Sequence, residues 1–215
     1  MINRSTVTLT FILLFLIAGC DKGSSSDNPN GSDDVTATFT DPVFAQFCLD
    51  NFDKNKDGIL SGDELESVTS IIALNLKAES LAGIEKFSNL TQLIVEEGEL
   101  KVLDVSKNTK LSRIVCGSNK LTVLDFSKND NLVSVSCSNS SLEELILPQG
   151  SNKLTSIGCS GTKLKTLDIS RYTKLESLTC QNDPPFKLYV WPGFSKENLK
   201  ECYLNPETEI IEKKQ

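Results

Sequence analysis

The chain has 215 residues, a formal charge of −7 and no histidine. Without histidine it can build neither a Ser-His-Asp nor a Cys-His catalytic arrangement, nor a zinc site that includes histidine. The negative charge and the lack of a clustered Lys/Arg stripe argue against nucleic acid as a partner, because the phosphate backbone is itself negative. We therefore expect no nucleic-acid binding and no histidine-dependent chemistry.

Residues 1–19 have the features of a signal peptide. Arg4 is followed by an apolar stretch at 7–17, which is too short to span a bilayer, since that takes about 20 residues. The stretch ends in Leu-Ile-Ala-Gly-Cys, which resembles the lipobox of bacterial lipoproteins. The resemblance implies cleavage before Cys20 and attachment of a lipid such as palmitate to its thiol, so that the chain is anchored to a membrane. The alternative is an ordinary secretory signal with an incidental cysteine.

Residues 20–40 hold almost no apolar side chains beyond Cys20 and are rich in Asp, Ser and Gly. Such a composition predicts a flexible acidic linker. An acidic stretch after the lipidated cysteine resembles the surface-export signals of some Gram-negative anaerobes, which implies the bacterial outer membrane or cell surface as the location. The alternative is a plain solvated linker, with the domain facing the periplasm.

Residues 53–64 carry the sharpest motif. Asp-Lys-Asn-Lys-Asp-Gly-Ile-Leu-Ser-Gly-Asp-Glu agrees with the twelve-residue EF-hand calcium loop at each diagnostic position, and Gly58 allows its sharp turn. Ca²⁺ prefers six to eight oxygen ligands. The expected metal ligands are Asp53, Asn55, Asp57, the backbone carbonyl of Ile59, Ser61 through a water, and Glu64 through both carboxylate oxygens.

The flanks of this loop predict a helix-loop-helix over residues 41–70. Asp41 precedes a proline, a typical helix start, and Leu65, Val68 and Ile71 continue an apolar face after the loop. Calcium switches use paired EF-hands, and the sequence holds no second loop, so we interpret this one as a cap over the N-terminal end of the domain that follows. The alternatives are a metal-free Asp/Asn/Gly turn and a rim site that contacts a ligand.

Residues 71–205 repeat one pattern. Variants of Leu-x-x-Ile-x-Cys end at Cys116, Cys137, Cys159 and Cys180, which are 21, 22 and 21 residues apart. Leucines at this spacing, with a period of 20 to 29 residues, are typical of a leucine-rich-repeat solenoid. We predict a mostly-β solenoid of the α/β type: a right-handed superhelix with parallel strands, few helices and coils of about 21 residues.

Residues 71–76 and 90–95 are expected to be the first two arms, in register at a step of 19 residues. Residues 81–87 between them resemble the connecting turn-helix of internalin-like repeats. The alternating Leu-Asp-x-Ser arms resemble secreted repeat lipoproteins of Gram-negative anaerobic bacteria. For that group the resemblance implies a surface interaction role but no common ligand.

Alternation along each strand points Ile114 and Cys116, with their counterparts, into the core. In-register neighbours hold their side chains parallel, so we expect a ladder of reduced thiols; disulfides are the alternative in an exported chain. Asn119 is expected to bond the backbone of its turn. Asp104 and Asp125 are interpreted as turn caps rather than as an acidic ligand strip.

Ligand contacts are expected on the outward face of the main strands and in the aromatic segment that begins near residue 183. The face is mostly Ser, Gly and Thr, which suits a flat polymer such as a polysaccharide, although it is equally well explained as solvated surface. The aromatic segment either caps the last coil or forms a rim, and residues 206–215 are expected to be a charged tail. The candidate contact residues are Arg113, Ser134, Ser136, Ser156, Ser177, Thr179, Tyr189, Trp191 and Tyr203.

We interpret the chain as a monomeric, calcium-binding, lipid-anchored scaffold that binds protein or polysaccharide and is not an enzyme. The first alternative is a structural envelope lipoprotein with no dedicated ligand. The second is a glycan-acting enzyme. Glycosidases place two acids about 5–9.5 Å apart around a pocket, and a floor of serines supplies no such pair.

Overall fold

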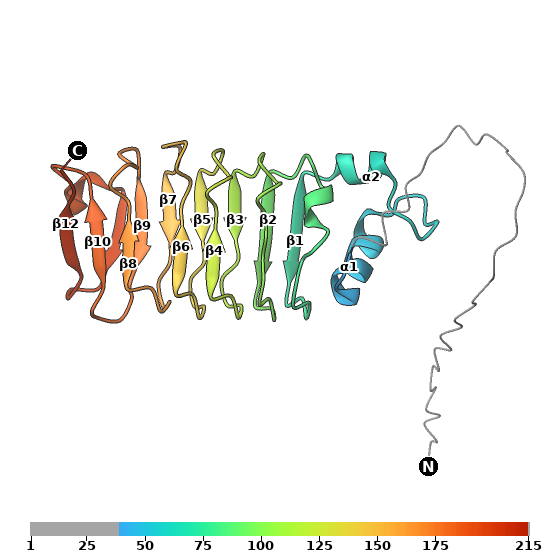
Figure 1. Cartoon of the computed structure of the whole chain (residues 1–215), viewed down its shortest axis with the longest axis horizontal. Coiled ribbons are helices and arrows are strands. Elements are labelled where there is room, and N and C mark those ends of the chain that lie inside the picture. Colours follow the sequence, from blue (N-terminus) through green and yellow to red (C-terminus); the bar gives the residue numbers. More distant parts are fainter. Residues whose placement is uncertain (1–38, 215) are drawn as a thin grey trace, which may run out of the picture. The chain divides into compact units, whose positions relative to one another are not determined.

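The computed structural model describes residues 39–214, which form a parallel β-solenoid that begins with two helices (Figure 1). The main sheet has seven parallel strands in the order β1-β2-β3-β5-β7-β9-β11. The remaining strands, which we call the back strands, form a 3-stranded and a 2-stranded sheet. The predicted mostly-β solenoid with parallel strands and few helices is confirmed. The predicted signal peptide, Cys20 and most of the linker lie outside the described residues.

Each coil contributes short strands to the solenoid. The main sheet contains β1 (Ser70–Leu74), β2 (Gln92–Glu96), β3 (Arg113–Val115), β5 (Ser134–Ser136), β7 (Ser156–Gly158), β9 (Ser177–Cys180) and β11 (Glu201–Leu204). The back strands are β4 (Val123–Asp125), β6 (Glu144–Ile146), β8 (Thr166–Asp168), β10 (Lys187–Val190) and β12 (Glu209–Glu212). The helices are α1 (Pro42–Phe52), α2 (Gly62–Ser67) and the short 3-10 turns η2 (Ile84–Lys86) and η3 (Lys196–Asn198).

The core is built from columns of equivalent residues in successive coils. Strand alternation buries every second side chain, and the four cysteines expected to point inward are fully buried as free thiols. Cys202 does not extend their column, because it lies beside Leu178, and Leu204 lies beside Cys180. Cysteine and leucine thus exchange positions in this strand, and the cysteine ladder ends at Cys180.

Buried asparagines close the turns between coils. The Asn119 amide donates to the carbonyls of Val95 (2.8 Å) and Gly117 (3.1 Å), and its oxygen accepts from the amide of Leu100. This confirms the predicted role of Asn119. Two further buried asparagines at the opposite turn, Asn108 and Asn129, were not predicted; their amides donate to the carbonyls of Ile84 and Val105 in the preceding coils. The sequence signal for these asparagines is the tripeptide Ser-Lys-Asn, which follows Asp104-Val105 and recurs after Asp125-Phe126.

Asp41 starts α1 and ties it to the first coil. Its Oδ1 accepts from the amide of Val43 at 2.9 Å, while its Oδ2 accepts from the amide of Glu79 at 2.8 Å. Phe44 is fully buried, and Phe52 packs edge-on against Phe87 at 5.5 Å between ring centroids. The helix therefore covers the apolar end of the first coil.

The start of the solenoid differs from the prediction. Ile71 pairs with Leu93, so the first step is 22 residues rather than 19, and Leu74 is exposed rather than buried. The second helix ends at Ser67 and does not continue to Ile71. The β-branched run at 68–72 explains both differences, because such residues favour strands over helices.

The end of the solenoid also differs from the prediction. The aromatic segment keeps the repeat, since Leu188 of β10 pairs with Leu167 of β8. Residues 206–215 are not simply a tail, because Ile210 pairs with Leu188 in a further strand, β12. Glutamates at both ends of β12, Glu209 and Glu212, hid this pattern. Within residues 39–214 no helix is long and apolar enough to cross a membrane.

Candidate functional site

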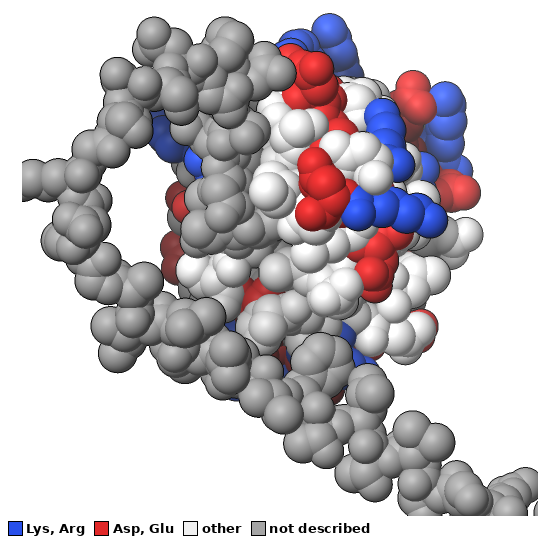
Figure 2. Space-filling view, turned by 90° about the vertical axis from the view of Figure 1, so that its right-hand side faces the viewer, with Lys and Arg blue, Asp and Glu red and all other residues white. Residues whose placement is uncertain are grey.

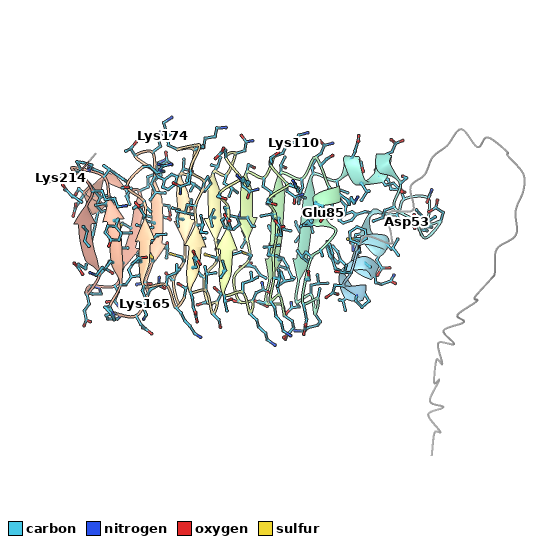
Figure 3. The ribbon with its side chains drawn as sticks, in the orientation of Figure 1. Asp53, Glu85, Lys110, Lys165, Lys174 and Lys214 are labelled. Carbon is cyan, nitrogen blue, oxygen red and sulfur yellow. The ribbon has the colours of Figure 1, made fainter. Side chains whose placement is uncertain are left out.

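The predicted calcium loop links α1 to α2 and lies at the N-terminal end of the solenoid, where Asp53 is labelled in Figure 3. Asp53 follows α1 directly, and its two oxygens accept from the amides of Lys56 (2.7 Å) and Gly58 (2.9 Å). Gly58 has φ +84°, a conformation that glycine adopts without steric cost. Leu60 is fully buried and fixes the loop to the core. The turn thus holds the Asp53 carboxylate close to the backbone amides of residues 56–58.

Asn55 and Asp57 continue the same arrangement. Asn55 Oδ1 accepts from the amide of Asp57 at 3.0 Å, and Asp57 Oδ1 accepts from the amide of Ile59 at 2.9 Å. The Asn55 amide also donates to Asp57 Oδ2 at 2.8 Å. These bonds bring the side chains of alternate loop residues together on one side of the turn.

Glu64 closes the loop. Its Oε2 accepts from the amide (2.9 Å) and hydroxyl (2.8 Å) of Ser61, and its Oε1 accepts from the amide of Lys54 at 2.7 Å. The bonds from Ser61 are the main reason that the pKa of Glu64 is lowered to about 2. The carboxylate is therefore ionised at neutral pH and joins the two ends of the loop.

Every predicted ligand in this loop offers oxygen, the donor that a hard cation such as Ca²⁺ prefers. In residues 39–214 no three His, Cys, Asp or Glu side chains are arranged to hold a metal. An EF-hand set also uses an amide, a hydroxyl and a backbone carbonyl, here from Asn55, Ser61 and Ile59. The chemistry of the loop fits calcium, and calcium binding stays a prediction.

The outward face of the main sheet brings most of the candidate contact residues together. Register places Arg113, Ser134, Ser156 and Ser177 in one row across β3, β5, β7 and β9. The next row contains Ser136, Thr179 and Tyr203. Tyr189 and Trp191 are not part of this face, because they belong to or follow β10 among the back strands.

The two separated aromatics have local partners. The Trp191 ring packs edge-on against Phe194 with centroids 4.9 Å apart, and both residues are partly buried against the core. The Lys213 ammonium lies 5.2 Å from the centroid of Tyr189. These contacts agree with the interpretation of the aromatic segment as cover for the last coils.

A cleft of about 550 Å³ lies among the back strands and includes the aspartates of the alternative acidic strip. Asp104 Oδ1 accepts from the amide of Ser106 at 2.9 Å, and Asp125 Oδ1 accepts from that of Ser127 at 2.7 Å. The bond from Ser106 lowers the pKa of Asp104, whereas a general acid needs a raised pKa. These aspartates cap turns, as predicted.

Charge and one missed feature complete the surface. At the end that carries α1 and α2, acidic and basic side chains are interspersed around uncharged surface (Figure 2). On the main sheet, Ile72 and Leu74 adjoin Ile94 and Val115, an apolar group that was not predicted. The missed signal is isoleucine at outward positions that later coils fill with serine or glycine.

The repeat columns, parallel strands and buried turn asparagine define a leucine-rich-repeat solenoid. Among solved structures the chain is similar to the functional domain of InlJ from Listeria monocytogenes, which includes a cysteine ladder, with 25% identity and a TM-score of 0.70. The match covers 86% of this chain and 44% of that one, so the chain spans less than half the length of InlJ's functional domain.

A second similar structure is an internalin, inlF, from Listeria monocytogenes, with 20% identity and a TM-score of 0.53 over 83% of this chain and 66% of that one. No protein-family model and no curated protein matches the chain. The similarities support internalin-like leucine-rich repeats.

Proposed function

We propose that the chain is a calcium-binding, lipid-anchored scaffold at a bacterial surface that binds a protein or a polysaccharide without catalysis. The observation that carries the proposal is the outward face of the main sheet, a continuous surface of seven paired strands over a packed core. A rigid repeat surface of this kind suits binding, since repeat solenoids use extended surfaces for recognition. Similarity to two Listeria proteins of the internalin kind supports a repeat scaffold.

Calcium has a structural role in this proposal. Asp53 ends α1 and Glu64 lies in the first turn of α2, so a cation shared by both would hold the two helices together. The same helices cover the first coil through Phe44 and Leu65. The proposed ligands are Asp53, Asn55, Asp57, Ile59 through its carbonyl, Ser61 and Glu64.

The calcium role is tested by thermal unfolding with calcium or with a chelator. Calcium at 100-fold excess over Kd should stabilise the parent chain by about 2.7 kcal/mol. Glu64→Gln should lose this difference, and Glu66→Gln, an exposed neighbour on the same helix, should keep it. A parent chain that melts at one temperature in both conditions contradicts the calcium role.

The binding role is tested by screening the full chain against glycans and surface proteins, with calcium or chelator. Binding without turnover supports the scaffold, product formation supports the enzyme alternative, and no ligand in any condition supports a structural envelope lipoprotein. Lipid anchoring is tested separately with Cys20→Ser, which should move the chain from the membrane fraction to the soluble fraction. A variant that stays in the membrane fraction contradicts lipid attachment at this thiol.

A further inference from the structure

The central outward row of the main sheet changes chemistry along the solenoid. Strand register places Ile72, Ile94 and Val115 side by side in β1, β2 and β3, and Ser136 and Gly158 continue the row in β5 and β7. Ile72 is 56% exposed. Leu74, at the end of β1, is 58% exposed and adjoins the row. We use the name apolar row for the three apolar residues of this row (Ile72, Ile94 and Val115) together with Leu74 beside them.

The repeat itself shows that the fold does not need this row. Ser136 and Gly158 occupy the equivalent strand position in later coils, so the position accepts a small side chain. Ile72 and Leu74 are exposed, and Ile94 and Val115 are half-buried, so apolar surface is left in water at a position where the fold does not need it. Adjoining apolar residues on an otherwise polar face are typical of a protein interaction site.

Opposite charges lie on the two flanks of the apolar row. On one flank, Arg113 of β3 lies beside Gln92 of β2. On the other flank, Glu96 of β2 lies beside Leu74 of β1. In the part of the chain described here, neither side chain forms an ion pair. A partner that covers the row would therefore meet one free cation and one free anion in fixed positions.

We propose that the apolar row docks an amphipathic α-helix of a partner protein, which lies across β1, β2 and β3. Neighbouring strands are about 4.8 Å apart and a helix advances about 5.4 Å per turn, so one apolar side chain per turn meets each strand. The helix carries an acid on the side of Arg113 and a base on the side of Glu96, which fixes its direction. The inference rests on the proposed scaffold function and specifies its partner.

The probe is a phage-displayed library of random 20-residue peptides, selected on the full chain in calcium. Enriched peptides should share apolar residues at i, i+3 or i+4, and i+7, and anisotropy measures their affinity. Val115→Ser and Ile94→Ser should each weaken binding about tenfold, which corresponds to about 1.4 kcal/mol. Val123→Ser is the control, because Val123 is also a strand valine but lies exposed on β4, away from the main sheet, and it should leave affinity unchanged.

Charge reversal gives a test that does not alter the core. Arg113→Glu should weaken binding of the enriched peptide. Replacing the acidic peptide residue that faces position 113 by lysine should restore the affinity. Enriched peptides without helical periodicity, or affinity indifferent to Val115→Ser, would overturn the proposal. Binding of phosphatidylethanolamine/phosphatidylglycerol vesicles that needs the same residues would also overturn it, in favour of a membrane surface. If other ligands still bind while these peptides do not, only this inference fails and the scaffold function stands.

Discussion

The sulfur atoms of Cys159 and Cys180 lie 2.9 Å apart in the core, and both residues are free thiols. The hydrogen bond between them, together with burial, raises the pKa of Cys159 well above its usual value. Burial likewise raises the pKa of Cys137 to about 12. At neutral pH these thiols stay protonated and pack as small apolar side chains.

We therefore predict that the buried thiols of the folded chain resist alkylation. The thiolate is the reactive form, so Cys116, Cys137, Cys159 and Cys180 should react only after unfolding. Cys202, which is partly exposed, should react before them. Mass spectrometry of peptides after iodoacetamide treatment, with and without denaturant, measures this order. Equal labelling of Cys159 and Cys202 in the folded chain, or a mass lower by two hydrogen atoms because of a disulfide, contradicts the prediction.

Asp41 offers a second prediction, because one carboxylate caps α1 and also holds the first coil. Asp41→Ala should lower the free energy of unfolding by about 0.5–2 kcal/mol, the range for a lost N-cap. Asp41→Asn keeps an oxygen for Val43 but cannot accept from Glu79, so its loss should be smaller. Urea titration of the three proteins measures the order. If Asp41→Asn loses as much free energy of unfolding as Asp41→Ala, the prediction is contradicted.

The same carboxylate gives a dependence on pH. Burial raises the pKa of Asp41, but four backbone amides lower it more, so the pKa in the folded chain is below the usual value of an aspartate. A lowered pKa stabilises the fold at pH above the unfolded value, and this contribution is lost as the pH falls below it. The parent should therefore lose more stability than Asp41→Asn between pH 5 and pH 3, as thermal melts would measure. Parallel pH profiles would argue against this role.

Asn119 carries a third prediction. Asn119→Ala leaves the buried carbonyl of Val95 without a donor and the amide of Leu100 without an acceptor, which should cost about 2–3 kcal/mol. Ser140 is the matched control in the next coil, because its hydroxyl donates once, to the carbonyl of Cys137. Ser140→Ala should cost about 1 kcal/mol. Chemical unfolding gives both values, and a larger cost at Ser140 would show that Asn119 does not organise its turn.

Periodicity made the central coils predictable. Leu93, Ile114 and their counterparts recur at nearly constant spacing, and in a stacked solenoid equal spacing means equal position. The prediction was wrong where other patterns compete with the period. At the start, Leu74 matches the leucine spacing, yet the β-branched run around Ile72 sets the strand three residues earlier. At the end, two isoleucines lie between Glu209 and Glu212, and no leucine marks their strand.

The candidate sites show the same difference between local and long-range information. The loop from Asp53 to Glu64 could be proposed as a calcium site from the sequence because all its oxygens come from one short segment, and calcium binding stays a prediction. The surface was only partly readable. Alternation gives the outward side of each strand, but only the register shows that Ile72 lies beside Ile94, and that Trp191 lies apart from Tyr203.

The C-terminal edge leads to the last prediction. Glu212 lies beside Val190, a buried position in the preceding coil, and its Oε1 accepts from the amide of Gly193 at 3.3 Å. An inward-pointing charge on an edge strand opposes pairing with another chain, because association would bury the carboxylate. Glu212→Val should therefore promote self-association, whereas Glu209→Val, on the outward side of the same strand, should do so less. Light scattering during size-exclusion chromatography measures the mass of each variant. If Glu212→Val elutes as a monomer at every concentration at which the parent does, Glu212 does not guard this edge.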